Sequence, residues 1–442
     1  MVHMVSPNKI FEKLITLTSN FRFYIAYSGG LDSHVLLHVM SECLKKNPFL
    51  RIQALHINHG LSSKSKLWEQ HCRCVCEQLR IPVQVERVKL EILPGRSIEK
   101  IAREARYAIF RRVIREDENI LTAHTQNDQA ETFLLQLMRG AGIKGLSSMP
   151  IKKKLGSGYL LRLLLNFCRN ELQDYAEKNF LHWIEDDTNL ELRFNRNYLR
   201  HRILPILQKR WSKAFPIISR SASHCAEAAI LLDQLADNDL LTVQNGMKLA
   251  IKPLLQLTSS RQKNVLRRWI AHKGFLVPQT KQLEQIQKDV LKATRGANPI
   301  FTYGNVEIRR YDDELYLSNV LRHWNTNLVI PWSFCELLML PANLGVLKAV
   351  KRKGVGITTA IRTCQVTIRF RKGGEQCSPV GRKKSSLLKE LMREWKIPVW
   401  QRNAVPLVYY EEKLVSVIGY CVCEEFSVKS SEWGWVICRE TR

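Results

Sequence analysis

The chain has 442 residues, of which 45% are hydrophobic, enough apolar material for about two to four packed domains. Its 68 lysines and arginines against 41 acidic residues give a net charge of +27, which favours a polyanionic partner, most simply a nucleic acid. No apolar run reaches the roughly 18 residues of a membrane-spanning helix, and the first residues lack the apolar core of a signal peptide. We therefore expect a cytoplasmic protein without a membrane partner.

The first third of the chain alternates predicted strands with predicted helices. Apolar runs predict strands at 23–27, 51–57, 83–88 and 119–123. Apolar residues at helical spacing predict helices at 32–46, 65–79, 97–115 and 128–139. This alternation is typical of an α/β fold, a doubly wound and mostly parallel sheet with helices on both faces. Ligands of such sheets bind beyond the carboxyl ends of the strands, so Ser28, the segment 56–59 and His124 should converge on one crevice.

The rest of the chain changes character twice. Residues 140–158, which are rich in glycine and carry three consecutive lysines, are predicted to form a loop before a helix at 169–179. Long helical patterns then predict a small, mostly helical domain, and a last portion with strands around one helix predicts a separate α+β domain. We therefore expect three domains, at 1–210, 215–325 and 330–442.

The most informative segment is Ser28-Gly29-Gly30-Leu31-Asp32-Ser33, between the first predicted strand and the first predicted helix. A glycine turn at a helix N-terminus presents free backbone N–H groups and the positive end of the helix dipole to one point, which suits a phosphate. The two glycines let the backbone approach the phosphate oxygens closely, and the two serines add hydroxyl donors. Asp32 fits beside a polyanion if Mg²⁺ lies between its carboxylate and the phosphates. The alternative is an ordinary turn before a helix.

Two carboxylates could carry chemistry beside that loop. Asp128 and Glu131 lie three residues apart at a predicted helix start, so they share one helical face. Next to a triphosphate they could bind Mg²⁺, hold a cationic amine or take a proton from a nucleophile. The alternative is that acids at a helix N-terminus only favour the helix dipole.

Two pairs of arginines also lie at helical spacing. Arg103 and Arg106 are three apart, which suits either a grip on phosphate or a solvated, salt-bridged helix face. Arg196 and Arg200 are four apart in a basic segment, and they either reach the nucleotide or contact the backbone of an RNA.

The last domain carries a basic cluster with aromatic neighbours. Basic side chains neutralise phosphates and aromatic rings stack on exposed bases, so this cluster is a candidate RNA-binding surface, although Trp395 and Trp400 also fit a protein core. The candidate cations here are Arg371, Lys372, Arg382, Lys383 and Lys384.

The segment 28–33 resembles the signature of the PP-loop ATP pyrophosphatases, which cleave ATP between the α- and β-phosphates and adenylate a substrate. The ordered set of motifs is similar to the tRNA(Ile)-lysidine synthetase family. The matching segments are 28–33, 56–61, 102–107, 122–132, 139–146, 183–189, 196–200, 369–375, 397–400 and 406–407. The family usually reads His-His-x-Asp-Asp-Gln where this chain reads His124-Thr125-Gln126-Asn127-Asp128-Gln129, so Thr125 and Asn127 depart from the pattern.

The resemblance implies an ATP-dependent ligase that adenylates the wobble cytidine of an isoleucine tRNA with a CAU anticodon and then attaches L-lysine. It implies ATP and Mg²⁺ as cofactors, with ATP held by the segment 28–33, His56, Asn58, Arg103 and Arg106. Asp32 would bind the metal, and the catalytic candidates are Asp32, Asp128, Glu131 and Arg196. Arg200 joins the tRNA-binding candidates of the last domain.

Two alternatives remain, a PP-loop tRNA thiolase and a non-catalytic RNA-binding protein on a nucleotide-binding fold. A thiolase usually carries a Cys-x-x-Cys pair, which is missing here, and the intact phosphate loop with both carboxylates disfavours a non-catalytic protein. The sequence leaves the oligomeric state open, a homodimer included.

Overall fold

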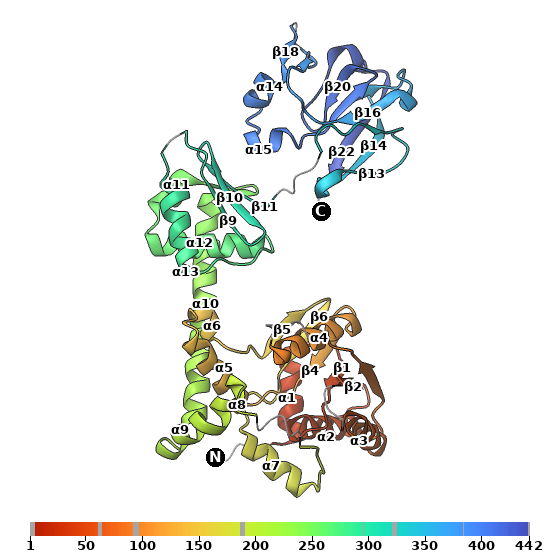
Figure 1. Ribbon diagram of the computed structural model, residues 1–442. Helices are drawn as coiled ribbons and strands as arrows, with labels where there is room; N and C mark the ends of the chain where they lie inside the picture. The colour runs from red at the N-terminus through yellow and green to blue at the C-terminus, as the bar shows by residue number, and fades with distance from the viewer. Residues whose placement is uncertain are drawn as a thin grey trace. The chain divides into compact units, whose positions relative to one another are not determined.

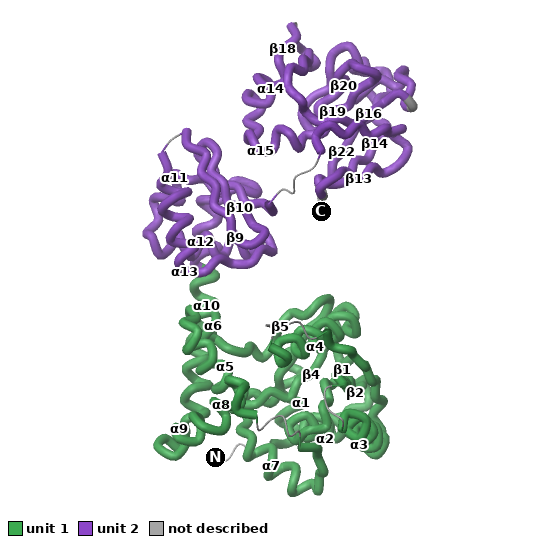
Figure 2. The backbone as a smooth tube through the Cα atoms, in the orientation of Figure 1, with its two compact units in different colours: residues 1–234 green, residues 235–442 purple. Residues whose placement is uncertain are grey.

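The computed structural model divides the chain into two compact units, residues 1–234 and 235–442 (Figure 2). It describes residues 5–60, 64–91, 97–185, 191–294, 296–320, 325–382 and 384–440. Within these ranges, no helix is at once long and apolar enough to cross a bilayer. The three-domain boundaries at 1–210, 215–325 and 330–442 stay a prediction.

The first unit is built on a six-stranded sheet in the order β3-β2-β1-β4-β6-β5 (Figure 1). Its strands are β1 (Arg22–Ala26), β2 (Arg51–Asn58), β3 (Val83–Arg87), β4 (Asn119–Leu121), β5 (Lys152–Leu155) and β6 (Gly158–Leu161). All neighbouring pairs are parallel except β5 with β6, which is antiparallel. The predicted doubly wound, mostly parallel sheet is confirmed.

Each face of the sheet has its own core, because successive side chains of a strand point to opposite faces. Phe23 of β1 packs with Leu36 and Leu172 on one face, whereas Ile120 of β4 packs with Phe110 on the other. The first face is covered by α1 (Pro7–Leu17), α2 (Leu31–Lys46), α3 (Ser65–Gln78) and α7 (Arg169–Lys178), and the second by α4 (Ile98–Val113).

The prediction of a loop at 140–158 was wrong. This segment contains the short helix α6 (Ile143–Leu146) and the strand β5, which forms a hairpin with β6 through Gly156 at a φ of +58°. The ammonium groups of Lys152 and Lys154 lie 4.4 and 4.6 Å from the ring centre of Tyr159 on β6. Because β5 is an edge strand, it tolerates a run of charged side chains that hides the alternation expected of a strand.

A group of helices beside the sheet completes the first unit. They are α5 (Gln126–Met138), α8 (Asn195–Tyr198), the short π-helix 199–203, α9 (Leu204–Arg210) and α10 (Ala214–Val243), which ends in the second unit. Ala130 of α5 packs against Leu204 and Phe215, so α5 is held against the segment that carries the predicted arginines.

The first part of the second unit combines helices with an antiparallel sheet. The sheet has the order β7-β8-β11-β10-β9, and Trp269 and Ile270 lie in the core beneath it. The elements are β7 (Gln244–Asn245), β8 (Lys248–Ala250), α11 (Ile251–Gln256), α12 (Ser259–His272), α13 (Thr280–Gln285) with a π-helix at 286–291, β9 (Ile300–Tyr303), β10 (Val306–Tyr311) and β11 (Glu314–Asn319).

The C-terminal part contains two larger antiparallel sheets, in the orders β12-β16-β19-β20-β21 and β13-β14-β22-β15, around a shared apolar core. The strands are β12 (Ile330–Pro331), β13 (Leu338–Met339), β14 (Val346–Lys353), β15 (Ile357–Thr358), β16 (Val366–Arg369), β17 (Gln376–Cys377), β18 (Ser386–Leu387), β19 (Leu407–Tyr410), β20 (Lys413–Val417), β21 (Cys421–Val422) and β22 (Trp433–Glu440). The helices are α14 (Leu388–Glu394) and α15 (Val399–Arg402), so the predicted α+β class is confirmed.

Candidate active site

The predicted phosphate loop connects β1 to α2 and is already fixed by hydrogen bonds. The Ser33 hydroxyl donates to the Gly30 carbonyl oxygen at 2.9 Å, and the Ser28 backbone N–H donates to Ser33 Oγ at 3.2 Å. The 16-residue helix α2 begins at Leu31, directly after the loop. The positive end of its dipole therefore faces any ligand that the loop holds.

Gly29 is required at its position for two reasons. Its φ of +87° lies in the left-handed region, which side chains rarely adopt. A Cβ atom there would also lie 2.9 Å from Ile184 Cδ1 and 3.0 Å from Cys72 Sγ. The Ile184 N–H donates to the Gly29 carbonyl oxygen at 2.9 Å, so the segment before 186–190, which is outside the described residues, supports the loop from behind. Burial raises the pKa of the Cys72 thiol to about 12, which suits packing rather than reactivity.

Asp32 lies in the first turn of α2 with its carboxylate incompletely satisfied. Its Oδ1 atom is buried without a hydrogen-bond donor, and Arg169 Nε is 3.9 Å away. Burial raises the pKa of Asp32 to about 6, and the negative charge of Asp128 adds to the effect. A buried carboxylate oxygen that lacks a partner is a fitting ligand for a divalent cation. No group of three metal-ligating side chains occurs within the described ranges, and Mg²⁺ held by one carboxylate and substrate phosphates needs none.

Asp128 and Glu131 on α5 form a buried cluster with Arg196 and Arg200. Arg196 donates to Asp128 Oδ1 at 2.7 Å and to Glu131 Oε2 at 2.6 Å. Arg200 donates to Glu131 Oε1 at 2.6 Å and to Asp128 Oδ1 at 3.3 Å. The remaining oxygen, Asp128 Oδ2, accepts from the Thr125 N–H at 2.8 Å. All four carboxylate oxygens thus have donors.

The electrostatics of this cluster follow from its composition. Burial alone would raise the pKa of Asp128, but the charge of Arg196 and the hydrogen bond from the Thr125 backbone N–H outweigh it, and the pKa is lowered. Burial lowers the pKa of Arg196, but the two carboxylates raise it by more, so the pKa of Arg196 is raised overall. Burial lowers the pKa of His124 to about 3, so this imidazole is neutral. The cluster therefore sets two guanidinium groups against two carboxylates.

Thr125 and Asn127, which depart from the family pattern, are helix-capping residues. Thr125 is the N-cap of α5 and forms a capping box with Asp128. The Asn127 side-chain oxygen accepts a hydrogen bond from the Arg169 backbone N–H at 2.9 Å, which satisfies a free donor in the first turn of α7. An aspartate at 127 could accept the same bond, so the structure explains how either residue serves there.

We expect Asn127→Ala to loosen the first turn of α7, because capping bonds contribute about 1 kcal/mol. Amide hydrogen exchange in residues 169–172, measured by mass spectrometry on the whole protein, should accelerate about fivefold. Asn127→Asp is the matched control and should leave the exchange rate unchanged. Equal acceleration in both variants would contradict the capping role.

The residues at the end of β2 and directly after it differ in whether their side chains already have partners. His56 Nδ1 lies 3.0 Å from the Tyr27 carbonyl oxygen, and Asn58 Nδ2 donates to Glu69 Oε2 at 3.2 Å, so both side chains brace the loop region. His59, which the residue-level prediction omitted, has both ring nitrogens buried without partners. Burial and the nearby charge of Arg106 lower its pKa to about 4, so a neutral ring is available to a ligand.

More arginines lie around the site than the sequence indicated. Arg103 donates to the Tyr107 hydroxyl at 3.3 Å, and the pKa of Arg106 is lowered by burial and by the charge of Arg103. Arg162, buried to 2% exposure, donates to the Pro150 carbonyl oxygen while its Nε has no partner. No sequence signal marked Arg162 or Arg169, since each follows an unremarkable apolar segment. The excess of cations over carboxylates suits a polyanionic ligand.

A small cavity of about 140 Å³ connects the two halves of the site. Asp32 and Glu131 contribute carboxylates to its wall, Arg169 and Arg200 contribute guanidinium groups, and Phe215 contributes an aromatic side. Asp128 is not among the lining residues. A cavity with two anionic and two cationic groups is complementary to a ligand that itself carries both charges, such as a free amino acid.

The candidate RNA-binding cations of the C-terminal part differ in their partners. Arg382 forms an ion pair with Glu394, and Arg371 Nε lies 3.8 Å from Glu375 Oε2. Lys372 and Lys384 are exposed, whereas Lys383 lies outside the described residues. Trp395 and Trp400 are half-buried, and Trp395 stacks on Tyr420 at 5.3 Å between ring centres.

Three family models match successive parts of the chain. A PP-loop domain matches residues 5–207, the TilS substrate binding domain matches 249–316, and the TilS substrate C-terminal domain matches 366–438. Among solved structures, a tRNA thiolase, NcsA from Methanococcus maripaludis, is 18% identical over 50% of this chain and 77% of its own, with a TM-score of 0.43. A likeness at that level carries no argument about function.

Curated relatives match almost the whole chain. The tRNA(Ile)-lysidine synthase of Coxiella burnetii is 60% identical over 430 residues, 97% of this chain and 96% of the relative. The tRNA(Ile)-lysidine synthase of Serratia proteamaculans is 39% identical over 93% of this chain and 94% of the relative. Together with the phosphate loop, the buried acid–arginine cluster and the three domain matches, these relatives show that the chain belongs to the tRNA(Ile)-lysidine synthase family.

Proposed function

We propose that this chain is a cytoplasmic, ATP-dependent ligase that attaches L-lysine to the wobble cytidine of isoleucine tRNA with a CAU anticodon. The observation that carries the proposal is the cavity between the phosphate loop and α5, where Asp32 and Glu131 face Arg169 and Arg200. A nucleotide on the loop and an amino acid in the cavity would lie side by side. All residues of this arrangement come from one chain, so the site does not require a homodimer.

The chemistry has two steps, and each makes a demand on the residues. The O2 atom of the cytidine attacks the α-phosphorus of ATP, the bond to the β-phosphate breaks, and pyrophosphate leaves. The ε-amine of lysine then attacks C2, the C2–O bond breaks, and AMP leaves with that oxygen. Free lysine carries a protonated ε-amine, so a base must take one proton before the nitrogen attacks, and Glu131 in the cavity wall is our candidate.

We assign the phosphates of ATP to the loop 28–33, whose N–H groups and helix dipole stabilise the negative charge of the leaving pyrophosphate. His59 and Arg106, at the end of β2 and on α4, are our candidates for the rest of the nucleotide. Asp32 would hold Mg²⁺, which when bound neutralises charge on the phosphate oxygens.

We assign the lysine to the cavity of about 140 Å³. Glu131 lines it and would attract the side-chain ammonium, while Arg169 would pair with the α-carboxylate. Asp128 would act by holding Arg196 and Arg200 in place, since it pairs with both and, unlike Glu131, does not line the cavity. Arg196 would stabilise the charge on the adenylate from its position beside both carboxylates.

We keep the exposed basic residues of the C-terminal part as tRNA contacts, because each would neutralise a phosphate. Arg200, in contrast, is committed to Glu131 within the buried cluster, so we propose a structural and catalytic role for it rather than contact with tRNA.

The direct test is incubation of the protein with labelled lysine, ATP, Mg²⁺ and transcribed isoleucine tRNA. We expect one lysine per tRNA, with AMP and pyrophosphate released in equal amounts. The control is the same transcript with uridine at the wobble position, which should accept no lysine. Dependence on a sulfur donor would instead indicate the thiolase, and binding of tRNA without turnover would indicate a non-catalytic protein.

A further inference from the structure

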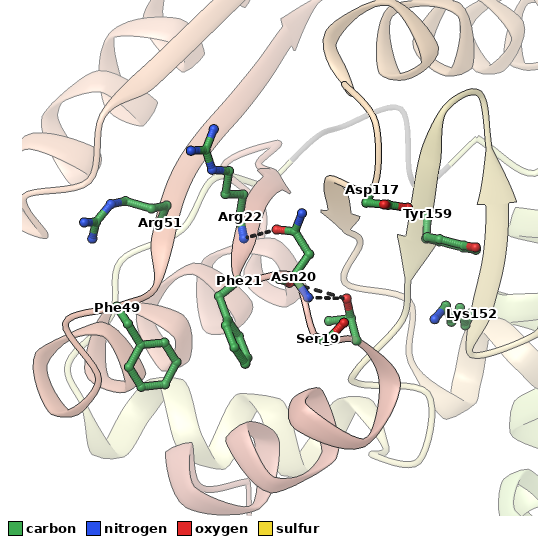
Figure 3. Close-up of a pocket in the computed structure, with 10 residues that line it drawn as sticks. Ser19, Asn20, Phe21, Arg22, Phe49, Arg51, Asp117, Lys152 and Tyr159 are labelled. Atoms are coloured by element: carbon green, nitrogen blue, oxygen red, sulfur yellow. Dashed lines mark hydrogen bonds between the residues drawn. The ribbon is translucent and has the colours of Figure 1, made fainter.

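The first unit carries a second, larger recess at the amino-terminal ends of the strands, on the side of the sheet opposite the phosphate loop (Figure 3). It has a volume of about 780 Å³ and begins where β1 and β2 begin. Arg22 and Arg51, the first residues of these strands, are in register and both line it. The phosphate loop follows the other end of β1, four residues and about 13 Å farther along the strand. The recess is therefore separate from the active site.

The recess is lined by cationic side chains, few of which are paired with a carboxylate. Arg22 Nη1 is 4.0 Å from Glu118, a loose pair, and its side chain is 67% exposed. Arg51 donates to the backbone carbonyl oxygens of Pro48 and Leu50, and Lys152 donates to that of Leu17. Within the described ranges, no carboxylate pairs with Arg51 or Lys152. The exposed Asp117 is the acidic side chain in the lining, so the recess keeps a positive surplus.

The recess also presents an aromatic surface beside these cations. Figure 3 shows Phe49 and Arg51 at one end, Tyr159 and Lys152 at the other, and Phe21 and Arg22 between them. Phe49 is 51% exposed, and its ring packs edge-on against Phe21 with 4.9 Å between ring centres. Tyr159 is already covered by the ammonium groups of Lys152 and Lys154. Phe49 is therefore the ring on which a flat ligand group can stack.

We propose that this recess is a second RNA-contact site, which takes a nucleotide of the substrate tRNA. Its phosphates would lie on Arg51, Arg22 and Lys152, and its base would stack on Phe49. Exposed cations spaced along an edge, together with one exposed ring, match a continuous polyanion with bases better than a small ligand that needs burial. The net charge of +27 favours the same partner. The inference rests on tRNA being the substrate, as proposed above.

The test compares two charge reversals of equal size in the full-length protein. Arg51→Glu removes a proposed phosphate contact, and Lys9→Glu, at the exposed first turn of α1, is the matched control because a glutamate suits a helix N-terminus. Binding of the isoleucine tRNA transcript is measured at several salt concentrations. We expect Arg51→Glu to weaken binding at least about fivefold and to reduce the slope of log K against log salt by about one. Lys9→Glu should match the wild type.

A stacking variant and a rate measurement complete the experiment. Phe49→Ala should weaken tRNA binding at least about fivefold with the salt slope unchanged, because stacking involves no counterion. At saturating tRNA, both recess variants should form lysidine at the wild-type rate. Wild-type affinity in Arg51→Glu and Phe49→Ala would overturn the recess proposal. Absence of lysine incorporation by the wild-type protein would overturn the proposed function instead.

Discussion

Replacing Asp32 with asparagine should abolish lysidine formation and at the same time stabilise the protein in the absence of nucleotide. Activity should fall at least about a hundredfold, because the carboxylate that would hold Mg²⁺ is lost while the phosphate loop stays intact. Stability should rise because Asp32 Oδ1 is buried without a donor and faces the charges of Asp128 and Glu131. With 29% of the side chain exposed, we expect a gain of about 1 kcal/mol, or roughly 2–4 °C in the melting temperature.

The pH dependence of this gain has a definite sign. The pKa of Asp32 is about 6 in the folded protein against an ordinary value of 3.8, so the folded state binds the proton more tightly. The wild type therefore loses stability as the pH rises from about 4 to 6, and the loss is complete above that range. The difference in melting temperature between Asp32→Asn and the wild type should be small at pH 4, grow to about pH 6 and then level off.

Two controls make this prediction specific. Asp174→Asn removes an exposed carboxylate from α7 and should change neither activity nor the pH profile of stability. Addition of Mg²⁺ and ATP should stabilise the wild type more than Asp32→Asn, because the variant lacks the ligand. Pyrophosphate release by Asp32→Asn near the wild-type rate, or a destabilised variant above pH 6, would contradict the role of Asp32.

The phosphate loop could be predicted from the sequence because its signal is local. An apolar strand, two glycines and a helix start are contiguous, and the structure has them as β1, the loop and α2. The parallel sheet followed from alternation over the first 140 residues for the same reason. The support behind the loop could not be predicted, since Cys72 and Ile184 reach Gly29 from segments 43 and 155 residues away.

The hydrogen-bond partners of Asp128 and Glu131 could not be predicted from the sequence either. The spacing of the two carboxylates predicts a shared helical face. It does not show that Arg196 and Arg200, more than 60 residues later in the chain, donate hydrogen bonds to both side chains. The hairpin at β5 was missed because consecutive lysines on an edge strand give no alternation, although Lys152 and Lys154 pack on Tyr159. Pairing across more than 60 residues hid the partners of the two carboxylates, whereas a local run of lysines hid the hairpin.

Replacing Glu131 with glutamine should destabilise the first unit by about 3–5 kcal/mol and eliminate activity. The side chain is 1% exposed and accepts three hydrogen bonds from Arg196 and Arg200, so its loss leaves two half-buried guanidinium groups with one carboxylate. Removing one partner of a buried ion cluster costs the desolvation of the charge that remains. Urea unfolding of the whole protein, followed through amide exchange in α5, measures the change.

Removing Arg200 as well should separate the structural role of Glu131 from its catalytic one. In the double variant Glu131→Gln/Arg200→Gln, Arg196 and Asp128 remain as a balanced pair, so we expect most of the lost stability to return. Activity should not return, because the cavity would lack both the carboxylate for the lysine ammonium and the neighbouring guanidinium.

The exposed pair Glu42 and Lys45 on α2 provides the matched control cycle, with a 2.6 Å contact but a side-chain exposure of 68% for the lysine. Its coupling energy should stay below about 1 kcal/mol, since solvent screens it. A coupling between Glu131 and Arg200 no larger than this would contradict the buried cluster. Recovery of lysidine formation in the double variant would show that lysine is held elsewhere, and a double variant that stays as unstable as Glu131→Gln would show that Arg196 cannot be balanced by Asp128 alone.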